Sequence, residues 1–149
     1  MQTKAAKSFR KWGYSWLALV AAFAIHVLDE AVNEFLPLYN SIVTGLRDSF
    51  RFVPFPTFTF GVWLGGLLAA IVILAMLTPL AFSGRSYFRI VSYVFSIIMI
   101  LNGLGHIAAS LYWGHLVPGV LSSPLLLVAG MVLLISTPST RRIAGAGGL

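Results

Sequence analysis

Long apolar runs constrain this chain more than any other feature of its sequence. Four such runs, each about 20 residues long, are spread over the 149 residues, and a helix needs a run of that length to cross the hydrocarbon core of a bilayer. Only 9% of the residues are charged, against about 25% in soluble domains. We therefore predict an all-α fold, a four-helix transmembrane bundle forming a single transmembrane domain over residues 1–149, with spans at about residues 12–36, 58–82, 88–113 and 116–136.

The basic residues predict how the bundle is oriented. Most of them fall at the start of the chain, in the turn between the second and third spans, or after the last span, and an excess of basic residues marks the cytoplasmic side of a membrane protein. We therefore predict a multi-pass integral membrane protein with both termini in the cytoplasm. The net charge of +6 does not indicate nucleic-acid binding, because the charges flank the spans. The residues on the cytoplasmic side are Lys4, Lys7, Arg10, Lys11, Arg85, Arg89, Arg141 and Arg142.

The first span has a second interpretation. Its basic start, the apolar run at residues 16–25 and the small residues at 22–24 resemble a secretory signal peptide with a cleavage site. We expect the segment to be retained as a membrane span. The chain has no cysteine, which excludes disulfides and thiolate metal ligands.

The segment 37–57 between the first two spans mixes apolar residues with charges. Pro37, Pro54 and Pro56 bracket it, and Arg47 and Arg51 lie between them. This mixture favours a short helix in the outer membrane interface, which serves either as a plain connector or as a lid over a substrate.

Two further patterns concern packing. The glycines of Gly61–Gly65 and the adjacent Gly66 favour close helix contact, either within the chain or between two copies of it. The second alternative would make the protein a homo-oligomer. Aromatic residues near the ends of the spans are expected to anchor them at the interface: Trp12, Trp16, Tyr39, Tyr112 and Trp113.

An acidic cluster follows His26 in the first span. Three of the chain's four acidic residues are Asp29, Glu30 and Glu34, and at about 100° per residue they share one helix face with His26 and Asn33. Ionisable groups at membrane depth are energetically expensive and by default mark a functional site.

The third span carries matching polar groups at the same depth. Asn102 and His106 are four residues apart and share a helix face. At a rise of about 1.5 Å per residue, Glu30 and His106 both lie about 27 Å from the cytoplasmic starts of their helices. We therefore expect one site in the outer half of the bilayer, with His115 on the same side.

The carboxylates of this site have no basic residue at their own level. Their charge calls for a divalent cation, shared protons, or Arg47 and Arg51 folding in from the connecting segment. Carboxylate and imidazole ligands without thiolate suit zinc, iron or manganese. We predict a metal held by residues from the set His26, Asp29, Glu30, His106 and His115.

The remaining polar residues are candidates for catalysis. Asp29, Glu30, Glu34 and Asn102 are the predicted catalytic residues, with Glu34 acting as a general base or as a charge at the entrance. Asn102 either takes part directly or orients His106. The alternative to a catalytic or metal site is a purely structural role, in which these groups form hydrogen bonds that hold the helices together.

Three short motifs together resemble the HXXEE-domain family of membrane proteins. His26–Glu30, Asn102–His106 and Leu116–Gly119 stand in the order and approximate spacing of its HxxEE, NxxxH and terminal YxPG motifs, over roughly residues 26–119. Asp29 replaces the first Glu, and Leu116 replaces the Tyr, which removes a phenol. The resemblance implies a small polytopic protein with a shared polar site, and it implies no particular reaction.

The residues favour a membrane-embedded, metal-dependent enzyme that acts on a lipidic or other apolar substrate, by hydrolysis or by metal-dependent oxidation. A second hypothesis is metal-free acid–base isomerisation or cyclisation of an isoprenoid-like substrate. A third is a proton- or cation-coupled transporter, which four short spans without a visible repeat make less attractive.

Overall fold

The structure is a computed structural model that describes residues 4–50 and 54–138, and every regular element in these ranges is a helix. The all-α prediction is confirmed. The helices α3 and α4 continue each other as one apolar span, Phe60–Phe82, so the described residues form five helices and not the predicted four. The elements are α1 (Lys4–Val32), α2 (Phe35–Ser49), α3 (Phe60–Met76), α4 (Thr78–Phe82), α5 (Phe88–Trp113) and α6 (Ser123–Ser136).

Three helices are long and apolar enough to cross a membrane: Ala6–Val32, Phe60–Phe82 and Phe88–Trp113. The first ends at Val32, short of the predicted residue 36. The predicted fourth span is wrong in its first part, because residues 114–122 are not helical and α6 has only 14 residues. At 1.5 Å per residue such a helix is about 21 Å long, less than the roughly 30 Å of hydrocarbon in a bilayer.

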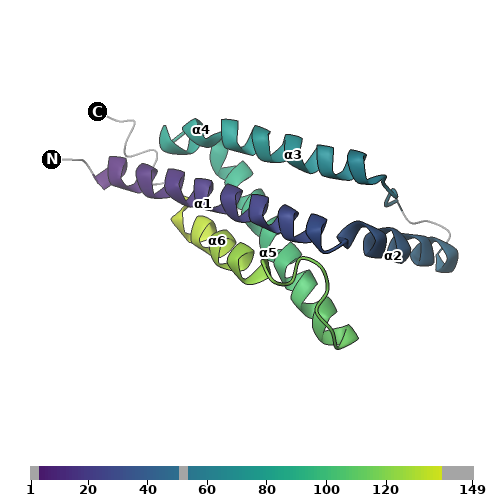
Figure 1. The fold of residues 1–149 in the computed structure, drawn as a ribbon. Coiled ribbons are helices and arrows are strands. Elements are labelled where there is room, and N and C mark those ends of the chain that lie inside the picture. The colour runs from purple at the N-terminus through teal and green to yellow at the C-terminus, as the bar shows by residue number, and fades with distance from the viewer. Residues whose placement is uncertain (1–3, 51–53, 139–149) are drawn as a thin grey trace.

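The helices are arranged around α1 (Figure 1). The α3–α4 span runs back along one side of α1, α6 lies along another side, and α5 crosses behind it at an angle. Helix α2 continues beyond the end of α1, and the chain after α5 folds back beside that helix before α6 begins. The non-helical segment 114–122 thereby passes beside α1, with Val117, Gly119 and Ser122 buried and the residues at 114–116 exposed.

Local backbone features end the helices where the sequence pattern alone would extend them. Glu34 has a left-handed conformation, with φ 61° and ψ 42°, which separates α1 from α2. Pro79 cannot donate a backbone hydrogen bond, which accounts for the interruption at Leu77 between α3 and α4. Gly114 ends α5 with φ 68°, the left-handed conformation typical of a helix end.

The apolar core fills the half of the bundle near the start of α1. Trp12 and Trp16, predicted as interfacial anchors, are instead fully buried there. The indole of Trp12 donates to Ser92 Oγ at 3.0 Å, and that of Trp16 donates to the Leu74 carbonyl at 3.0 Å. A buried indole N–H needs such a partner, and two transverse bonds of this kind tie α1 to the spans on either side of it.

Helix α2 provides the short helix predicted in the segment 37–57. Arg47 donates to the carbonyl of Phe55, and the Asn40 amide bonds Phe58 at 2.9 and 3.1 Å, so the segment folds back on itself. Among the described residues, Arg47 therefore forms no ion pair with the acids of α1. Arg51 lies outside the described residues.

The glycines of α3 do not pack against the rest of the described chain. A Cβ placed on Gly61, Gly65 or Gly66 would have no other atom within 4 Å. Packing within the chain, one of the two roles predicted for these glycines, is therefore absent among the described residues, while association of two copies stays a prediction.

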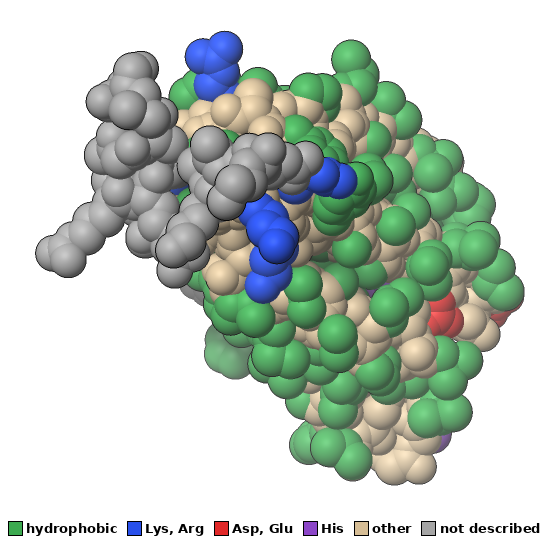
Figure 2. Space-filling model, turned by 90° about the vertical axis from the view of Figure 1, so that its left-hand side faces the viewer, with side chains coloured by type: hydrophobic (Ala, Val, Ile, Leu, Met, Phe, Trp, Pro, Cys, Tyr) green, Lys and Arg blue, Asp and Glu red, His purple; other side chains and the backbone are tan. Residues whose placement is uncertain are grey.

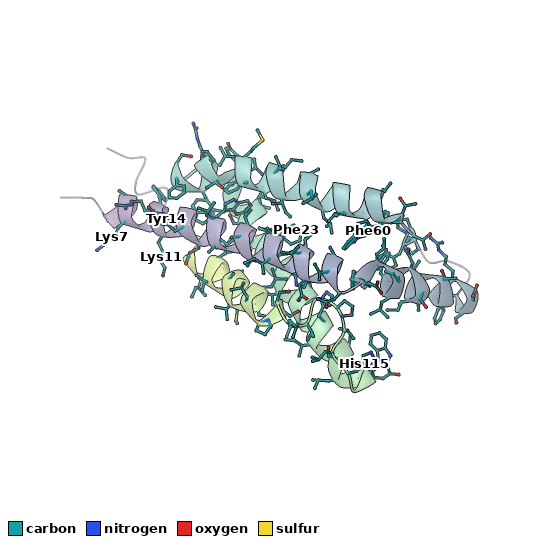
Figure 3. All side chains as sticks on the ribbon, in the orientation of Figure 1. Lys7, Lys11, Tyr14, Phe23, Phe60 and His115 are labelled. Atoms are coloured by element: carbon teal, nitrogen blue, oxygen red, sulfur yellow. The ribbon has the colours of Figure 1, made fainter. Side chains whose placement is uncertain are left out.

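Basic side chains gather at one end of the bundle, which faces the viewer in Figure 2. Lys7 and Lys11 project from the start of α1 at that end (Figure 3), and Arg10 and Arg85 are likewise exposed. Arg141 and Arg142 lie outside the described residues. This segregation of charge agrees with the predicted orientation, which itself stays a prediction.

Candidate functional site

Three buried side chains from two distant helices meet near the far end of α1. His26 and Glu30 are one helical turn apart on α1, and His106 approaches them from α5. Glu30 Oε1 lies 3.1 Å from His106 Nε2 and 3.5 Å from His26 Nε2. One ligand atom from each of the three residues lies within 4.8 Å of the others. The helical register and the matched depth of the two spans thus bring one carboxylate between two imidazoles.

The spacing of these atoms fits a metal ion. Two ligands at about 2.0–2.1 Å from a tetrahedral zinc lie about 3.3 Å apart, which is close to the 3.1 and 3.5 Å separations around Glu30. His26 is fully buried, and its Nε2 atom has no hydrogen-bond partner among the described residues. A buried nitrogen without a partner is energetically costly, and a cation between the three side chains would satisfy it.

The other nitrogen of His26 belongs to a second set of hydrogen bonds. His26 Nδ1 lies 2.8 Å from Ser122 Oγ, which in turn lies 2.7 Å from Asp29 Oδ2. Asp29 also accepts from the Ser122 backbone N–H at 2.9 Å and from the Asn33 amide at 2.7 Å. Asp29 is therefore tied to the chain before α6 and to its own helix, and it does not join the three-residue cluster.

The segment 114–122 closes the site. Gly119 has φ +88°, and a Cβ there would come within 2.7 Å of the His106 ring and 3.1 Å of Glu30 Cγ. The Gly119 carbonyl accepts from Ser123 Oγ at 2.8 Å, and the Val117 N–H donates to Ser110 Oγ at 3.0 Å. Irregular backbone at membrane depth is tolerated when protein groups satisfy it in this way.

Two pockets reach the cluster from either side of Phe35, whose ring lies 5.1 Å from that of His106. The first, of about 280 Å³, lies between α2 and α5 and includes Asn102 and His106 among mostly apolar residues. The second, of about 310 Å³, includes Glu30, Glu34 and Trp63. The cluster is thus reachable through an apolar opening on the His106 side and a more polar one on the Glu30 side.

The structure brings some predicted site residues together and leaves others apart. Glu34 is exposed and reaches only the second pocket. Asn102 lines the first pocket, and its Oδ1 has no hydrogen-bond partner among the described residues, so the predicted hydrogen bond that would orient His106 is not among the interactions found. His115 is exposed beyond the end of α5 (Figure 3) and bonds the Trp113 carbonyl at 3.1 Å, outside the cluster.

Sequence reasoning missed three residues that shape the site. Phe35 and Gly119 touch His106, and Ser122 bonds both His26 and Asp29. Gly119 belongs to one of the three motifs, and its place directly after Pro118 is a turn signal. Ser122 stands directly before Ser123–Pro124, a helix-start signal that predicts the beginning of α6 but not the contacts of its side chain. Phe35 carries no signal of this kind.

Comparison with known proteins identifies a family. The model of the HXXEE family, described as "protein of unknown function with HXXEE motif", matches residues 16–134. No curated protein and no solved structure matches the chain. The matched region contains the whole cluster, both pockets and the segment 114–122. The chain therefore belongs to the HXXEE family.

Proposed function

We propose that this chain is a membrane-embedded, metal-dependent enzyme that acts on a lipidic or other apolar substrate. The observation that carries the proposal is the buried His26–Glu30–His106 cluster, in which one imidazole nitrogen has no hydrogen-bond partner within the described part of the chain. Groups that only joined two helices would satisfy one another and leave no buried nitrogen unpaired.

Charge and ligand type narrow the choice of ion. One carboxylate and two imidazoles suit a divalent zinc, iron or manganese. Three protein ligands leave a coordination position open, which is typical of catalytic rather than structural metal sites. When bound, the ion would activate a water or a substrate oxygen for hydrolysis, or dioxygen if the ion is iron.

The two pockets suggest how a substrate would lie. The pocket between α2 and α5 offers apolar walls beside His106, in a part of the bundle where membrane lipid is the natural surrounding. A substrate whose apolar chain lies there would place its polar end near the side-chain Oδ1 of Asn102, which has no hydrogen-bond partner among the described residues. On the opposite side, Glu34 faces the same pocket as Glu30 and would act as a general base or as a charge at the polar entrance.

The predicted orientation, with both termini in the cytoplasm, places this site in the outer half of the bilayer. Asp29 bonds Ser122 and Asn33, and His115 bonds the Trp113 carbonyl. We therefore restrict the proposed ligands to His26, Glu30 and His106.

A metal-free acid–base enzyme is the second candidate. The specific observation in its favour is the 3.1 Å contact between Glu30 and His106, which is itself a paired acid and base. This alternative keeps the same pockets and an apolar substrate such as an isoprenoid, and it requires no ion.

Elemental analysis of the purified protein tests the proposal. We expect one transition-metal ion per chain in the wild type, and loss of that ion in His26→Ala, Glu30→Gln and His106→Ala. The matched control is His115→Ala, which removes an exposed histidine outside the cluster and should leave the metal content unchanged.

Reconstitution decides between the candidates. A wild-type protein that takes up no stoichiometric transition metal, even after exposure to zinc, iron and manganese, would refute the metal-dependent mechanism. Lipid extracted from the same preparation tests the substrate class. We expect an apolar compound to co-purify with the wild type. Ala109 lies in the wall of the first pocket, and Ala109→Trp, which fills that pocket, should reduce the amount of this compound.

A further inference from the structure

We infer that Ser122 and Asp29 are positioning residues that fix the tautomer of His26, so that its Nε2 lone pair faces the cluster. The inference rests on the proposed metal site, and it adds a residue from the segment before α6 that the motifs do not contain. It also gives Asp29 a role other than that of a metal ligand.

Three possible hydrogen-bond acceptors lie near the hydroxyl of Ser122, which has a single proton to donate. Its oxygen lies 2.7 Å from Asp29 Oδ2, 2.8 Å from His26 Nδ1 and 3.2 Å from the Gly119 carbonyl. A carboxylate and a carbonyl only accept hydrogen bonds. If the proton pointed at His26 instead, the oxygens of Ser122 and Asp29 would face each other at 2.7 Å with no hydrogen between them. The hydroxyl therefore donates to Asp29, the closer and charged acceptor.

The tautomer of His26 follows from that assignment. Since the Ser122 hydroxyl donates its hydrogen bond to Asp29, its oxygen can only accept from His26, and Nδ1 must carry the hydrogen. The neutral ring then has its lone pair on Nε2. Nε2 is the atom that lies 3.5 Å from Glu30 and has no hydrogen-bond partner among the described residues.

Asp29 is held as an acceptor by its other contacts. The backbone N–H of Ser122 donates to the same oxygen at 2.9 Å, and the Asn33 amide donates to the second oxygen at 2.7 Å. Donors on both oxygens are the pattern expected for an ionised carboxylate. This orientation of a ligating histidine through its second nitrogen is the arrangement that raises ligand basicity at metal sites.

A purely structural role for Ser122 is a weaker explanation. Ser122 occupies the N-cap position of α6, yet its side chain makes no capping hydrogen bond to that helix. The hydroxyl bonds side chains of α1 instead. Replacing it should therefore disturb His26 more than it disturbs α6.

The first test is spectroscopic and needs no metal. Nitrogen-15 NMR of histidine-labelled, metal-free protein in detergent micelles, with His26 assigned by comparison with His26→Gln, reports which ring nitrogen carries the proton. We expect hydrogen on Nδ1 in the wild type and in Ser122→Thr, which keeps the hydroxyl. We expect a mixture of tautomers in Ser122→Ala. A His26 with hydrogen only on Nε2 in the wild type would overturn the inference.

The second test is metal affinity, measured by competition with a chromophoric zinc chelator. Loss of such an outer partner typically weakens metal binding about 10- to 100-fold, which is the loss we expect for Ser122→Ala, with recovery in Ser122→Thr. The matched control is Ser123→Ala. Ser123 is also buried, but its hydroxyl bonds only the Gly119 carbonyl among the described residues, so its removal should leave zinc affinity within about twofold. Equal losses in Ser122→Ala and Ser123→Ala would contradict the inference.

Substitutions of Asp29 distinguish a positioning residue from a metal ligand. Asp29→Asn keeps an oxygen that can accept from Ser122, so a positioning role predicts near wild-type affinity, while Asp29→Ala loses about 10- to 100-fold. A metal ligand would lose affinity in both variants, because both remove the charge. If the wild type bound no metal at all, the proposed function would fail, and the NMR result would still decide the tautomer.

Discussion

The two halves of the bundle are built in different ways. The half near the start of α1 is an apolar core, in which Trp12, Trp16 and Phe88 are buried. The half near the end of α1 buries His26, Glu30 and His106, and there the chain departs from helix at Glu34 and over residues 114–122.

This difference reflects what each half has to satisfy. Side chains in the apolar half need close packing and hydrogen-bond acceptors for two indole N–H groups, which Ser92 and the Leu74 carbonyl provide. Side chains in the polar half need donors and acceptors aimed from several directions, and a helix keeps its own backbone groups occupied. Interrupting the helices frees the Ser122 N–H and the Gly119 carbonyl for side chains.

Trp16→Ala, in the apolar half, should have the largest effect on stability. Truncating a large aromatic residue in a packed core costs about 3–5 kcal/mol, and the hydrogen bond to the Leu74 carbonyl is lost as well. The free energy of unfolding, measured by titration with a denaturing detergent, should fall by that amount. Trp16→Phe, which keeps most of the ring, should lose less.

The same variant tests whether the halves are independent. Trp16 and His26 are about 15 Å apart along α1 at 1.5 Å per residue, and effects of distant sites usually add. Zinc affinity of Trp16→Ala should therefore stay near that of the wild type under conditions where the protein is folded. A large fall in affinity would show that the two halves are coupled.

Gly119→Ala should have an intermediate effect on stability and a large effect on the site. A left-handed residue with a Cβ costs about 1–2 kcal/mol, and here the Cβ would also press on His106 and Glu30. We expect zinc affinity to fall together with the free energy of unfolding.

Gly114→Ala is the matched control for that change. Gly114 has φ +68°, but a Cβ there would meet no atom within 4 Å. It should show the conformational cost alone, about 1–2 kcal/mol, with zinc affinity retained. If both variants bound zinc equally well, close packing of Gly119 against the cluster would not matter.

A substitution of Glu34 is expected to have a small effect on stability. Unlike the changes above, Glu34→Gly should raise the stability, because it relieves a strained backbone. Its φ of 61° is strained for a residue with a Cβ, so Glu34→Gly should be more stable than Glu34→Ala by about 1–2 kcal/mol, the same conformational cost as at Gly114. Both variants lack the carboxylate. A loss of the proposed catalytic activity common to both variants would therefore report on the missing carboxylate, and thermal unfolding would report on the backbone.

Much of the apolar half and part of the site could be predicted from the sequence. Hydropathy and length suffice to place three spans, because a bilayer requires long apolar helices. The helical rise of two spans was enough to expect Glu30 and His106 at one depth, and their side chains do meet at 3.1 Å. Regular geometry transmits position over many residues, and this makes such inferences possible.

The rest depended on irregular backbone. Residues 114–122 are apolar enough to resemble the start of a fourth span, and hydropathy therefore placed that start too early, although Pro118–Gly119 and Ser123–Pro124 are turn and helix-start signals. The contacts of Ser122 with α1 could not be foreseen, because they depend on how this irregular segment folds. His115 was grouped with the site from its position in the sequence, and the turn after Gly114 leaves it exposed. Trp12 and Trp16 were misplaced because aromatic residues near span ends are usually interfacial, while in this bundle partners on other helices bury them.

The short α6 has a consequence for how the protein is made. A helix about 21 Å long spans too little hydrocarbon to settle in a bilayer by itself, so it must be recruited by helices already in place. It is also the last described helix in the chain, and the residues just before it, Gly119 and Ser122, complete the site. The polar groups of α1 are therefore synthesised before the residues that complete their hydrogen bonds, and the site can close only after the chain has passed Ser122.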